Sequence, residues 1–297
     1  MAFPVEVFVV LFLFCSVMLV NGDVLFDENY QVTWGHHHAL LENGGTQMQI
    51  YLDNTTGAGF GSKQTFGAGW FEMRIKVPVR DCAGVVLAFY LRSQGVNGQD
   101  ELDFEFLGNR ENRPITLQTN VITNGQNYRE QRTVFWFDPT ADFHGYKILW
   151  NHHQVVFYVD EIPIRVFRNN KKFKVAYPTR PMEIAVSIWD GSSWATDGGR
   201  EKIDFTRAPF RAYFRKFDMH ACVVDRYKTE VSECYATKYL WNHRVFRQLN
   251  ATEQAAYDRV RRDFMNYDYC TDHQRFNNAL PRECTLGSSN QQYNGTT

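Results

Sequence analysis

Three acidic residues at alternate positions are the feature of this sequence that could do chemistry. Residues 100–108 read DELDFEFLG, in which Glu101, Asp103 and Glu105 are separated from one another by single apolar residues. Because side chains point alternately to the two faces of a β-strand, the acids would share one face and the apolar residues the other. The pattern predicts a strand with one buried face and one acidic face.

Carboxylates crowded on one face repel one another, which raises the pKa of at least one of them. A carboxylic acid beside an ionised carboxylate is what retaining glycoside hydrolysis requires: one group attacks the anomeric carbon and the other protonates the leaving oxygen. The Cα atoms of Glu101 and Glu105 would lie roughly 13 Å apart, whereas retaining carboxyl groups are about 5–5.5 Å apart. The two side chains would therefore have to lean toward each other over Asp103.

Two other interpretations fit the same strand. A solvated edge strand would use its acids only against aggregation, and carboxylates two residues apart can bind calcium. The strand by itself leaves all three interpretations open.

The elements around this strand predict an all-β fold. Short segments with strand patterns, separated by turn residues and without intervening helices, extend from about residue 30 to 215. The clearest are the alternating segments at residues 48–52, 70–77, 115–123 and 182–189 and the near-continuous apolar run at residues 85–91, which is typical of a strand buried on both faces. Such a series is typical of an antiparallel β-sandwich, here a jelly roll of the concanavalin-like type. Curvature of one sheet would gather the polar strand faces into a groove.

Residues 216–297 predict a short C-terminal extension rather than an independent domain. They contain four cysteines, which are Cys222, Cys234, Cys270 and Cys284. Four cysteines allow three pairings, of which we expect the two short loops, Cys222–Cys234 and Cys270–Cys284. The sequence that starts at Asn250 predicts a capping box and one helix. The polar tail from about residue 286 is expected to be disordered.

Residues 1–22 predict a cleaved secretory signal peptide. The apolar run from Val5 to Val20 contains Glu6 and is shorter than the roughly 20 residues that span a bilayer. We therefore favour cleavage over a membrane anchor, which leaves a catalytic domain at residues 23–215 and no membrane association. A net charge of −1 gives no field suited to nucleic acid. We expect a secreted monomer.

Secretion also makes disulfides and glycosylation available. After the pairings above, Cys82 would remain as a buried thiol, and the cysteine spacings do not resemble a zinc site. Sequons occur at Asn54, Asn250 and Asn294.

The motifs resemble those of plant xyloglucan endotransglucosylase/hydrolases, which are family-16 glycoside hydrolases. Besides DELDFEFLGN, the chain carries in order GWFEMRIKVP, AFYLRS, QTNVITNG, REQR, WFDPTADFHGYKILWN, SIWDGSSWATDGGR and MNYDYCTD. The resemblance covers nearly the whole mature chain. It implies an enzyme that acts on xyloglucan donor and acceptor chains in the plant cell wall, or apoplast, without a cofactor or metal ion.

The resemblance also implies roles by position. Glu101 would be the nucleophile, Glu105 the general acid/base, and Asp103 the residue that hydrogen-bonds the nucleophile and tunes its ionisation. Substrate contacts are implied at Glu105, Gln118, Thr119, Asn120, Tyr128, Arg129, Glu130, Trp189, Trp194, Ala195, Gly199 and Arg275. The two tryptophans have flat faces on which pyranose rings could stack.

Three positions depart from the family's usual pattern. Gln99 stands where the family usually has histidine, and a glutamine can hydrogen-bond but cannot be charged. Asn109 lacks the following Ser or Thr of a sequon, so we expect it to be unglycosylated. Cys82 stands where we expect a small polar residue.

The expected activity is cleavage of the β-1,4-glucan backbone of xyloglucan with retention, followed by transfer to another xyloglucan chain. The segment SIWDGSSWATDGG resembles the transferase-type members more than the hydrolase-type ones. The alternative activity is that of a xyloglucan-specific or mixed-linkage endo-β-glucanase. An alternative from another class is a lectin that binds glucans without cleaving them, but binding alone does not need three crowded acids.

Overall fold

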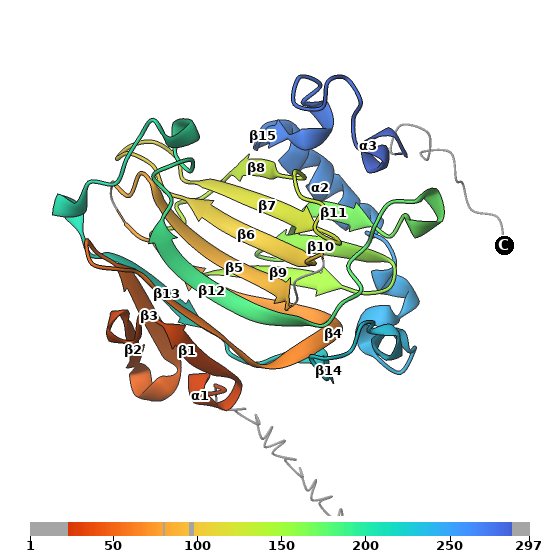
Figure 1. Cartoon of the computed structure of the whole chain (residues 1–297), viewed down its shortest axis with the longest axis horizontal. Helices are drawn as coiled ribbons and strands as arrows, with labels where there is room; N and C mark the ends of the chain where they lie inside the picture. Colours follow the sequence, from red (N-terminus) through yellow and green to blue (C-terminus); the bar gives the residue numbers. More distant parts are fainter. Residues whose placement is uncertain (1–22, 80, 95–97, 287–297) are drawn as a thin grey trace, which may run out of the picture.

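The structure, a computed structural model, describes residues 23–79, 81–94 and 98–286. The predicted signal peptide, the tail from residue 287 and the sequon at Asn294 lie outside the described residues. Antiparallel β-strands form the body of the molecule, and the helices besides α2 are short, which confirms the predicted fold class (Figure 1).

A single long strand, β4 (Ala58–Lys76), belongs to both layers of the sandwich. Its first half pairs with β12 and β1, and its second half pairs with β9 and β13. Glycine permits the close packing along the first half, since a Cβ atom at Gly59 would lie 2.2 Å from Nε1 of Trp34. The strand therefore joins the two sheets into one hydrogen-bonded network.

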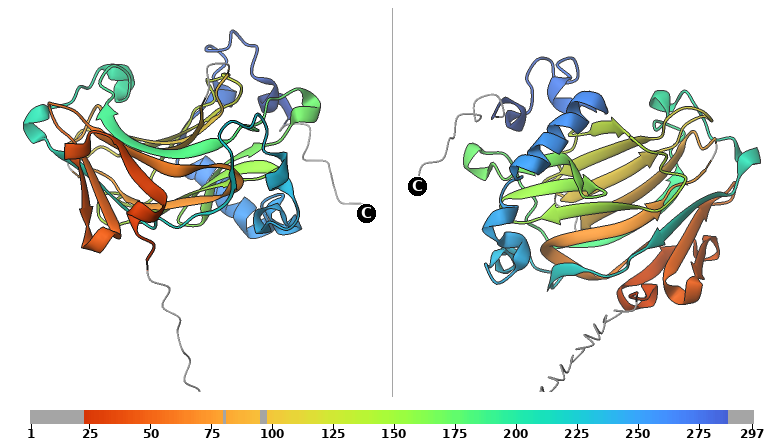
Figure 2. Two further views of the ribbon diagram at one scale, coloured as in Figure 1. Left: turned by 60° about the horizontal axis from the view of Figure 1, so that its bottom comes forward. Right: turned by 180° about the vertical axis from the view of Figure 1, so that it is seen from behind.

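The inner sheet runs in the order β1, β4, β12, β5, β6, β7, β8, β15. Its other strands are β1 (Tyr30–Trp34), β12 (Met182–Asp190), β5 (Val85–Ser93), β6 (Glu101–Leu107), β7 (Thr116–Ile122), β8 (Gln131–Val134) and β15 (Met265–Asp268). This sheet is curved, and its concave side is flanked by the β12–β13 connection and by the C-terminal extension (Figure 2).

The outer sheet packs behind the inner one. Its strands besides β4 are β11 (Ile162–Arg168), β10 (Gln154–Val159), β9 (His144–Trp150), β13 (Phe210–Arg215), β3 (Gln47–Leu52) and β2 (Ala39–Glu42), and β14 (His220–Val224) pairs with the middle of β4. Aromatic rings join the layers: Phe104 of β6 meets Phe157 of β10 edge-to-face with ring centroids 5.1 Å apart. Burial of such side chains is the main stabilising contribution to the sandwich.

The C-terminal residues extend this framework instead of folding apart from it. Strands β14 and β15 are paired into the sheets, and helix α2 (Ala251–Asp263) packs on β11. The capping box is present as predicted, with Oδ1 of Asn250 accepting from the backbone N–H groups of Thr252 and Glu253. The remaining helices, α1 (Phe26–Asn29) and α3 (Arg282–Leu286), are short.

Both predicted disulfides are confirmed, Cys222–Cys234 and Cys270–Cys284. Cys82 is a free and buried thiol, and burial raises its pKa to about 11. In the part of the chain that the structure describes, no helix has the length and apolarity needed to cross a membrane.

Candidate active site

Strand β6 carries the three acids on the concave face of the inner sheet. The side chains between them, Leu102, Phe104 and Phe106, are buried in the core. Register with β5 sets Glu101 opposite Arg92 and Asp103 opposite Tyr90. The alternation in the sequence thus has the predicted structural result: the apolar face fixes the strand and the acidic face lines the groove.

The entry to β6 is held by Asp100, whose side chain is 2% exposed. One of its carboxylate oxygens accepts from the N–H of Asn124 at 2.8 Å, and the other accepts from Thr179 and Arg180 at 2.8 and 3.1 Å. These donors come from the loop after β7 and from the segment before β12. Asp100 thereby ties two neighbouring loops to the residue that precedes Glu101.

Glu101 is partly buried, and Nε2 of Gln99 donates a hydrogen bond to its Oε2. Burial raises the pKa of Glu101, while hydrogen bonds from Asp103 and Gln99 and the charge of Arg92 lower it. Donors directed at the carboxylate favour its ionised form. The glutamine at position 99 therefore supplies a hydrogen bond to this acid without adding a titrating group.

Asp103 is buried, with 5% of its surface exposed. Burial, together with the charges of Glu101 and Glu105, raises its pKa well above the usual value. A protonated Asp103 can donate to Glu101, and this hydrogen bond raises the Asp103 pKa further while lowering that of Glu101. The geometry suits a neutral aspartic acid that stabilises an ionised neighbour.

Glu105 has the environment of a group that exchanges protons near neutral pH. Burial raises its pKa to about 7, although a hydrogen bond from Gln118 opposes the shift. Nε2 of Gln118 donates to Oε2 of Glu105 at 2.6 Å, and Nε of Arg132 donates to Oε1 of Gln118 at 2.7 Å. Burial thus raises the pKa of both glutamates, and what distinguishes Glu101 is the additional hydrogen bond from Asp103, which favours the ionised form that a nucleophile requires.

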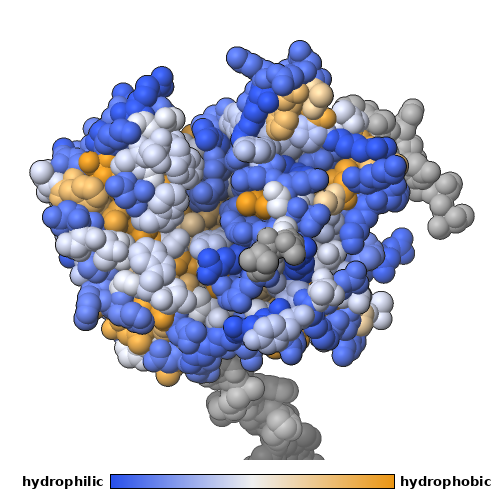
Figure 3. Space-filling view, in the orientation of Figure 1, coloured by the Kyte–Doolittle hydropathy of each residue, from blue (hydrophilic) through white to orange (hydrophobic). Residues whose placement is uncertain are grey.

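An apolar platform lies next to Glu105. The small hydrophobic cluster of Val86, Leu107 and Ala195 packs against Trp189 and Trp194 on the groove side of the sheet. The two tryptophan rings are 6.1 Å apart and tilted by 40°. In the space-filling view, hydrophilic residues cover most of this face, and hydrophobic residues are visible between its two raised sides (Figure 3).

A pocket of about 280 Å³ opens beyond this platform. Its walls come from the ends of β6 and β7, from β8, from the β12–β13 connection and from β15 of the C-terminal extension. The lining includes Leu107, Thr116, Arg132, Ala195, Asp197 and Tyr267. The pocket is built from both parts of the chain and begins at Leu107, two residues beyond Glu105 on the same face of β6, where it offers room for a sugar.

The predicted contacts on β7 divide between two faces. Gln118 and Asn120 lie opposite Glu105 and Asp103 on the groove side. Thr119 lies on the other face, 2% exposed, and its hydroxyl accepts from Nη1 of Arg165 at 3.1 Å. Strand alternation therefore turns the Thr119 side chain into the core, and the substrate contact predicted at this position stays a prediction.

The loop between β7 and β8 carries three further predicted residues. Tyr128 is 60% exposed, and the guanidinium of Arg275 lies 4.9 Å from its ring centroid. Glu130 accepts from the same guanidinium at 2.7 and 3.2 Å. Tyr128, Glu130 and Arg275 thus form one surface cluster, and the exposed ring is the part of it that is available to a ligand.

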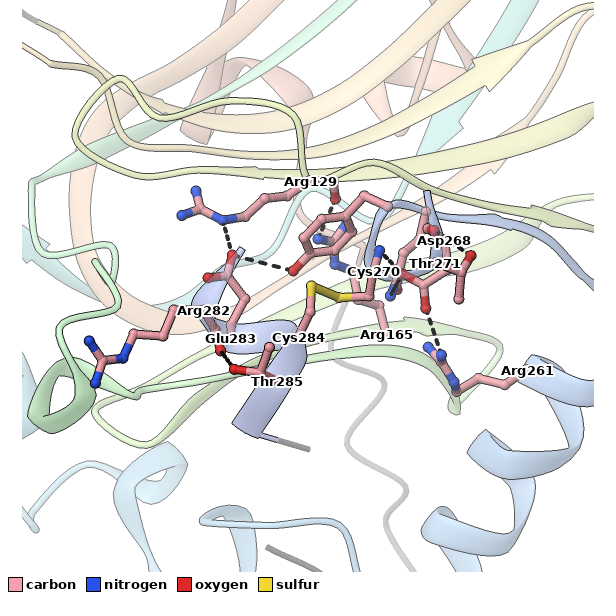
Figure 4. The surroundings of a disulfide bond; sticks show 12 residues. Arg129, Arg165, Arg261, Asp268, Cys270, Thr271, Arg282, Glu283, Cys284 and Thr285 are labelled. Carbon is pink, nitrogen blue, oxygen red and sulfur yellow. Dashed lines mark hydrogen bonds and ion pairs between the residues drawn. A yellow bond between two sulfur atoms is a disulfide. The ribbon is translucent and has the colours of Figure 1, made fainter. Parts of the chain in front are cut away.

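Arg129 lies beneath this cluster and is 5% exposed. Its Nε donates to Oε1 of Glu283 in α3, next to the Cys270–Cys284 disulfide (Figure 4). Its Nη1 donates to the backbone oxygens of Val121 at the end of β7 and of Gln126 in the loop. The guanidinium therefore fixes the loop and the extension, which leaves it no open face for substrate.

The β12–β13 connection holds the other predicted contacts. Trp194 is partly exposed, whereas Ala195 is buried in the platform. Gly199 has a φ of +84°, and a Cβ atom there would lie 2.2 Å from the Ser193 carbonyl oxygen. Gly199 therefore shapes the loop, and Trp194 offers the accessible surface.

Sequence reasoning missed two residues of the site, Arg132 and Asp100. Arg132 lies directly opposite Gln118 across the β7–β8 pair, so strand pairing was the signal needed to find it. Among the described residues, no group of three His, Cys, Asp or Glu side chains could hold a metal ion.

Comparisons with known proteins agree with this geometry. The profile of "Glycosyl hydrolases family 16" matches residues 26–207, and that of "Xyloglucan endo-transglycosylase (XET) C-terminus" matches residues 235–284. Xyloglucan endotransglucosylase/hydrolase protein 2 of Arabidopsis thaliana is 52% identical over 264 residues, 89% of this chain and 90% of that protein. Xyloglucan endotransglucosylase/hydrolase protein 3 of the same plant is 48% identical over 88% of this chain and 89% of that protein.

Solved structures share the fold. A β-glucanase of Bacillus licheniformis superposes with a TM-score of 0.53 at 22% identity, over 65% of this chain and 92% of its own. The Crh5 transglycosylase superposes with a TM-score of 0.52 at 24% identity, over 63% of this chain and 75% of its own.

Proposed function

The chain belongs to the family 16 glycosyl hydrolases, in the group of the xyloglucan endotransglucosylase/hydrolases, and on this premise we propose that it cuts xyloglucan and joins the cut end to a second xyloglucan chain. The full-length relatives and the C-terminal profile support transfer, and no relative quoted above is named as a mixed-linkage glucanase.

In the first step of the proposed reaction, the ionised Glu101 attacks the anomeric carbon of a glucosyl unit in the backbone. The bond from that carbon to the leaving oxygen breaks, and Glu105 gives its proton to the oxygen. The reducing-end part of the chain departs, and the remaining part is held as a glycosyl ester of Glu101. Asp103 is the neutral acid that donates a hydrogen bond to the nucleophile before attack.

In the second step, the ionised Glu105 takes the proton of an acceptor hydroxyl. The acceptor oxygen then attacks the anomeric carbon, and the ester bond to Glu101 breaks. Two inversions give overall retention. Water in place of the sugar hydroxyl would give hydrolysis, so the balance between the activities depends on what occupies the pocket beside Glu105.

The observation that carries the proposal is the row of three neighbouring acids on one strand. Burial raises the pKa of both glutamates, that of Glu105 to about 7, and Glu101 alone also accepts a hydrogen bond from the neutral Asp103, which favours its ionised form. Retaining transfer needs such a pair. We further propose that the mature protein acts as a secreted monomer in the plant cell wall. Its plant relatives and its two disulfides support the location.

The test uses xyloglucan as donor and a fluorescently labelled xyloglucan oligosaccharide as acceptor. We expect label to enter the polymer, and we expect the Glu101→Ala variant to lose at least about 10⁴-fold of this activity, as removal of a nucleophile does. Reducing ends that rise without incorporation of label would contradict transfer. Full activity of Glu101→Ala would contradict the assignment of the nucleophile.

A further inference from the structure

Arg132 is a charged residue in the pocket wall that also reaches the acid/base through another side chain. It lies on β8 opposite Gln118 of β7, and Gln118 in turn lies opposite Glu105 of β6. Two hydrogen bonds join them in sequence, from Arg132 Nε to Gln118 Oε1 at 2.7 Å and from Gln118 Nε2 to Glu105 Oε2 at 2.6 Å. We call this chain of three side chains the Arg132 relay.

The pocket end of the relay is open. Arg132 lines the pocket of about 280 Å³, and in the described part of the chain its terminal nitrogens have neither a hydrogen-bond partner nor a carboxylate in ion-pair distance. Its guanidinium lies 5.4 Å from the ring centroid of Tyr267, which belongs to the extension. Stacking on an aromatic ring orients a guanidinium while leaving its donors free. Those donors can therefore bind the hydroxyl groups of a sugar.

The charge of Arg132 acts on Glu105 at the other end. Burial is the main cause that raises the Glu105 pKa, with Glu101 and Glu130 as the acidic neighbours that raise it further, while Gln118 and Arg132 lower it. Ala88 and Ser187, which lie in the same row on β5 and β12, are uncharged. Arg132 is therefore the cation that opposes the effect of burial on this carboxyl group.

We propose that Arg132 couples occupancy of the pocket to the proton held by Glu105, so that a bound acceptor sugar promotes transfer over hydrolysis. This inference rests on the proposed function and deepens it. An acceptor in the pocket displaces water from the guanidinium, and a charge in a drier site acts more strongly on its neighbours. The polarised amide of Gln118 passes this effect to Glu105 and favours the carboxylate, which is the form that takes the proton from the acceptor hydroxyl.

The experiment compares transfer to a labelled xyloglucan oligosaccharide with release of reducing ends in wild type, Arg132→Met and Arg132→Lys. A hydrogen bond to a charged group contributes about 1.5–3 kcal/mol, so Arg132→Met is expected to lower the ratio of transfer to hydrolysis by about 10- to 100-fold. Arg132→Lys keeps the charge but cannot serve Gln118 and the pocket together, so a similar loss is expected. A wild-type ratio in Arg132→Lys would overturn the relay.

A matched control is Arg211→Met. Arg211 lies opposite Tyr51 across β13 and β3, with its guanidinium 5.8 Å from that ring, as Arg132 lies opposite Tyr267. Removing it takes away a stacked arginine far from the groove, and we expect no change in the ratio. An equal change in Arg211→Met and Arg132→Met would show a general structural effect and overturn the inference.

A double-mutant cycle with Gln118→Met tests the path. If the effect passes through Gln118, then Arg132→Met changes the ratio little in the Gln118→Met background; independent, additive losses would overturn the relay. Failure of the proposed function is seen separately, because wild type would then incorporate no label into xyloglucan. In that case, wild type and Arg132→Met are compared on the β-glucan that wild type does cleave. A ratio of transfer to hydrolysis that is the same in both proteins again rejects the relay.

Discussion

At the scale of single residues, the site depends on neighbours that give similar acids different protonation states. Glu101 and Glu105 lie four positions apart in one strand, and burial is the main cause that raises the pKa of each. Each accepts a hydrogen bond from an amide, but only Glu101 also accepts one from the neutral Asp103. The proton distribution is therefore set by the residues at positions 99, 103 and 118. The pH dependence of the unfolding free energy therefore reports the pKa values of these acids in the folded protein.

The first prediction concerns Glu105→Gln. In the folded wild type the Glu105 pKa is raised from 4.5 to about 7, so the folded state holds this proton more tightly than the unfolded state. Its contribution to stability is present below pH about 4.5 and is lost as the pH rises through about 7. The neutral glutamine has no such loss, so the variant should be more stable above pH 7 by up to about 3 kcal/mol. It should also be nearly inactive.

The measurement is urea denaturation of both proteins across pH 4 to 9. The difference in unfolding free energy should grow with pH between the two pKa values and then stay constant. A difference that does not vary with pH would mean that burial does not shift the proton equilibrium of Glu105.

Single positions also show what sequence can and cannot reveal. Alternation alone places Glu101, Asp103 and Glu105 on one face, and the same rule turns the Thr119 side chain into the core. The fate of Arg129 depends on Glu283, which is 154 positions away, so no local pattern could show that its charge is already paired. The role of Arg132 could not be predicted from local sequence either, because its partner Gln118 is set by the pairing of β7 with β8.

At the scale of elements, β6 is positioned by its buried face and also by hydrogen bonds at Asp100, the residue that precedes the strand. Asp100 collects three backbone N–H groups from two loops, and its own N–H donates to Oγ of Ser93 at 2.8 Å. Among the described hydrogen bonds, no other buried carboxylate accepts from the backbone N–H groups of these two loop segments. The position of Glu101 therefore depends on the residue just before it.

The second prediction is that Asp100→Asn lowers both stability and activity. The amide group replaces one acceptor oxygen with a donor, which leaves one or two buried N–H groups without a partner. Each such group costs about 1–3 kcal/mol, and loosening of the strand end should lower kcat with a smaller effect on the substrate KM. Chemical denaturation and steady-state kinetics check the two parts.

Asp142→Asn is the control, because Asp142 is exposed and accepts only from the N–H of its neighbour Phe143 at 2.7 Å. It should change neither quantity. If Asp100→Asn unfolds at the same urea concentration as wild type, Asp100 does not hold the loops.

Elements with strong local signals are predictable, and elements made by packing are not. The capping box at Asn250 predicts the start of α2, alternation predicts strands near β3, β7 and β12, and a continuous apolar run predicts β5. The length of β4, 19 residues, is hidden because its glycines resemble turn signals. They are present because Trp34 and the backbone of β12 lie against that strand, a contact that no local pattern contains.

At the scale of the whole molecule, the two disulfides hold the C-terminal extension at different places. Cys234 packs at the bend of β4, where a Cβ atom on Gly67 would lie 2.6 Å from its sulfur. The Cys270–Cys284 bond instead lies beside Glu283 and its ion pair with Arg129, and it follows closely after Tyr267 of the pocket wall (Figure 4). One bond therefore secures the sandwich and the other secures one side of the groove.

The third prediction separates these roles with two paired variants, Cys222→Ala with Cys234→Ala and Cys270→Ala with Cys284→Ala. The bonds close loops of similar length, with sequence separations of 12 and 14, so each loss should lower the unfolding free energy by about 3 kcal/mol. Only the second pair should also reduce transfer, because it releases Glu283, leaves the Arg129 charge buried without its partner and loosens the wall that carries Tyr267. Denaturation and the labelled-acceptor assay, both below the unfolding transition, measure the two effects. Equal losses of transfer in both variants would mean that the extension acts on the groove as a single rigid unit, whereas a loss confined to the second pair would place the control of acceptor binding in the short segment between β15 and α3.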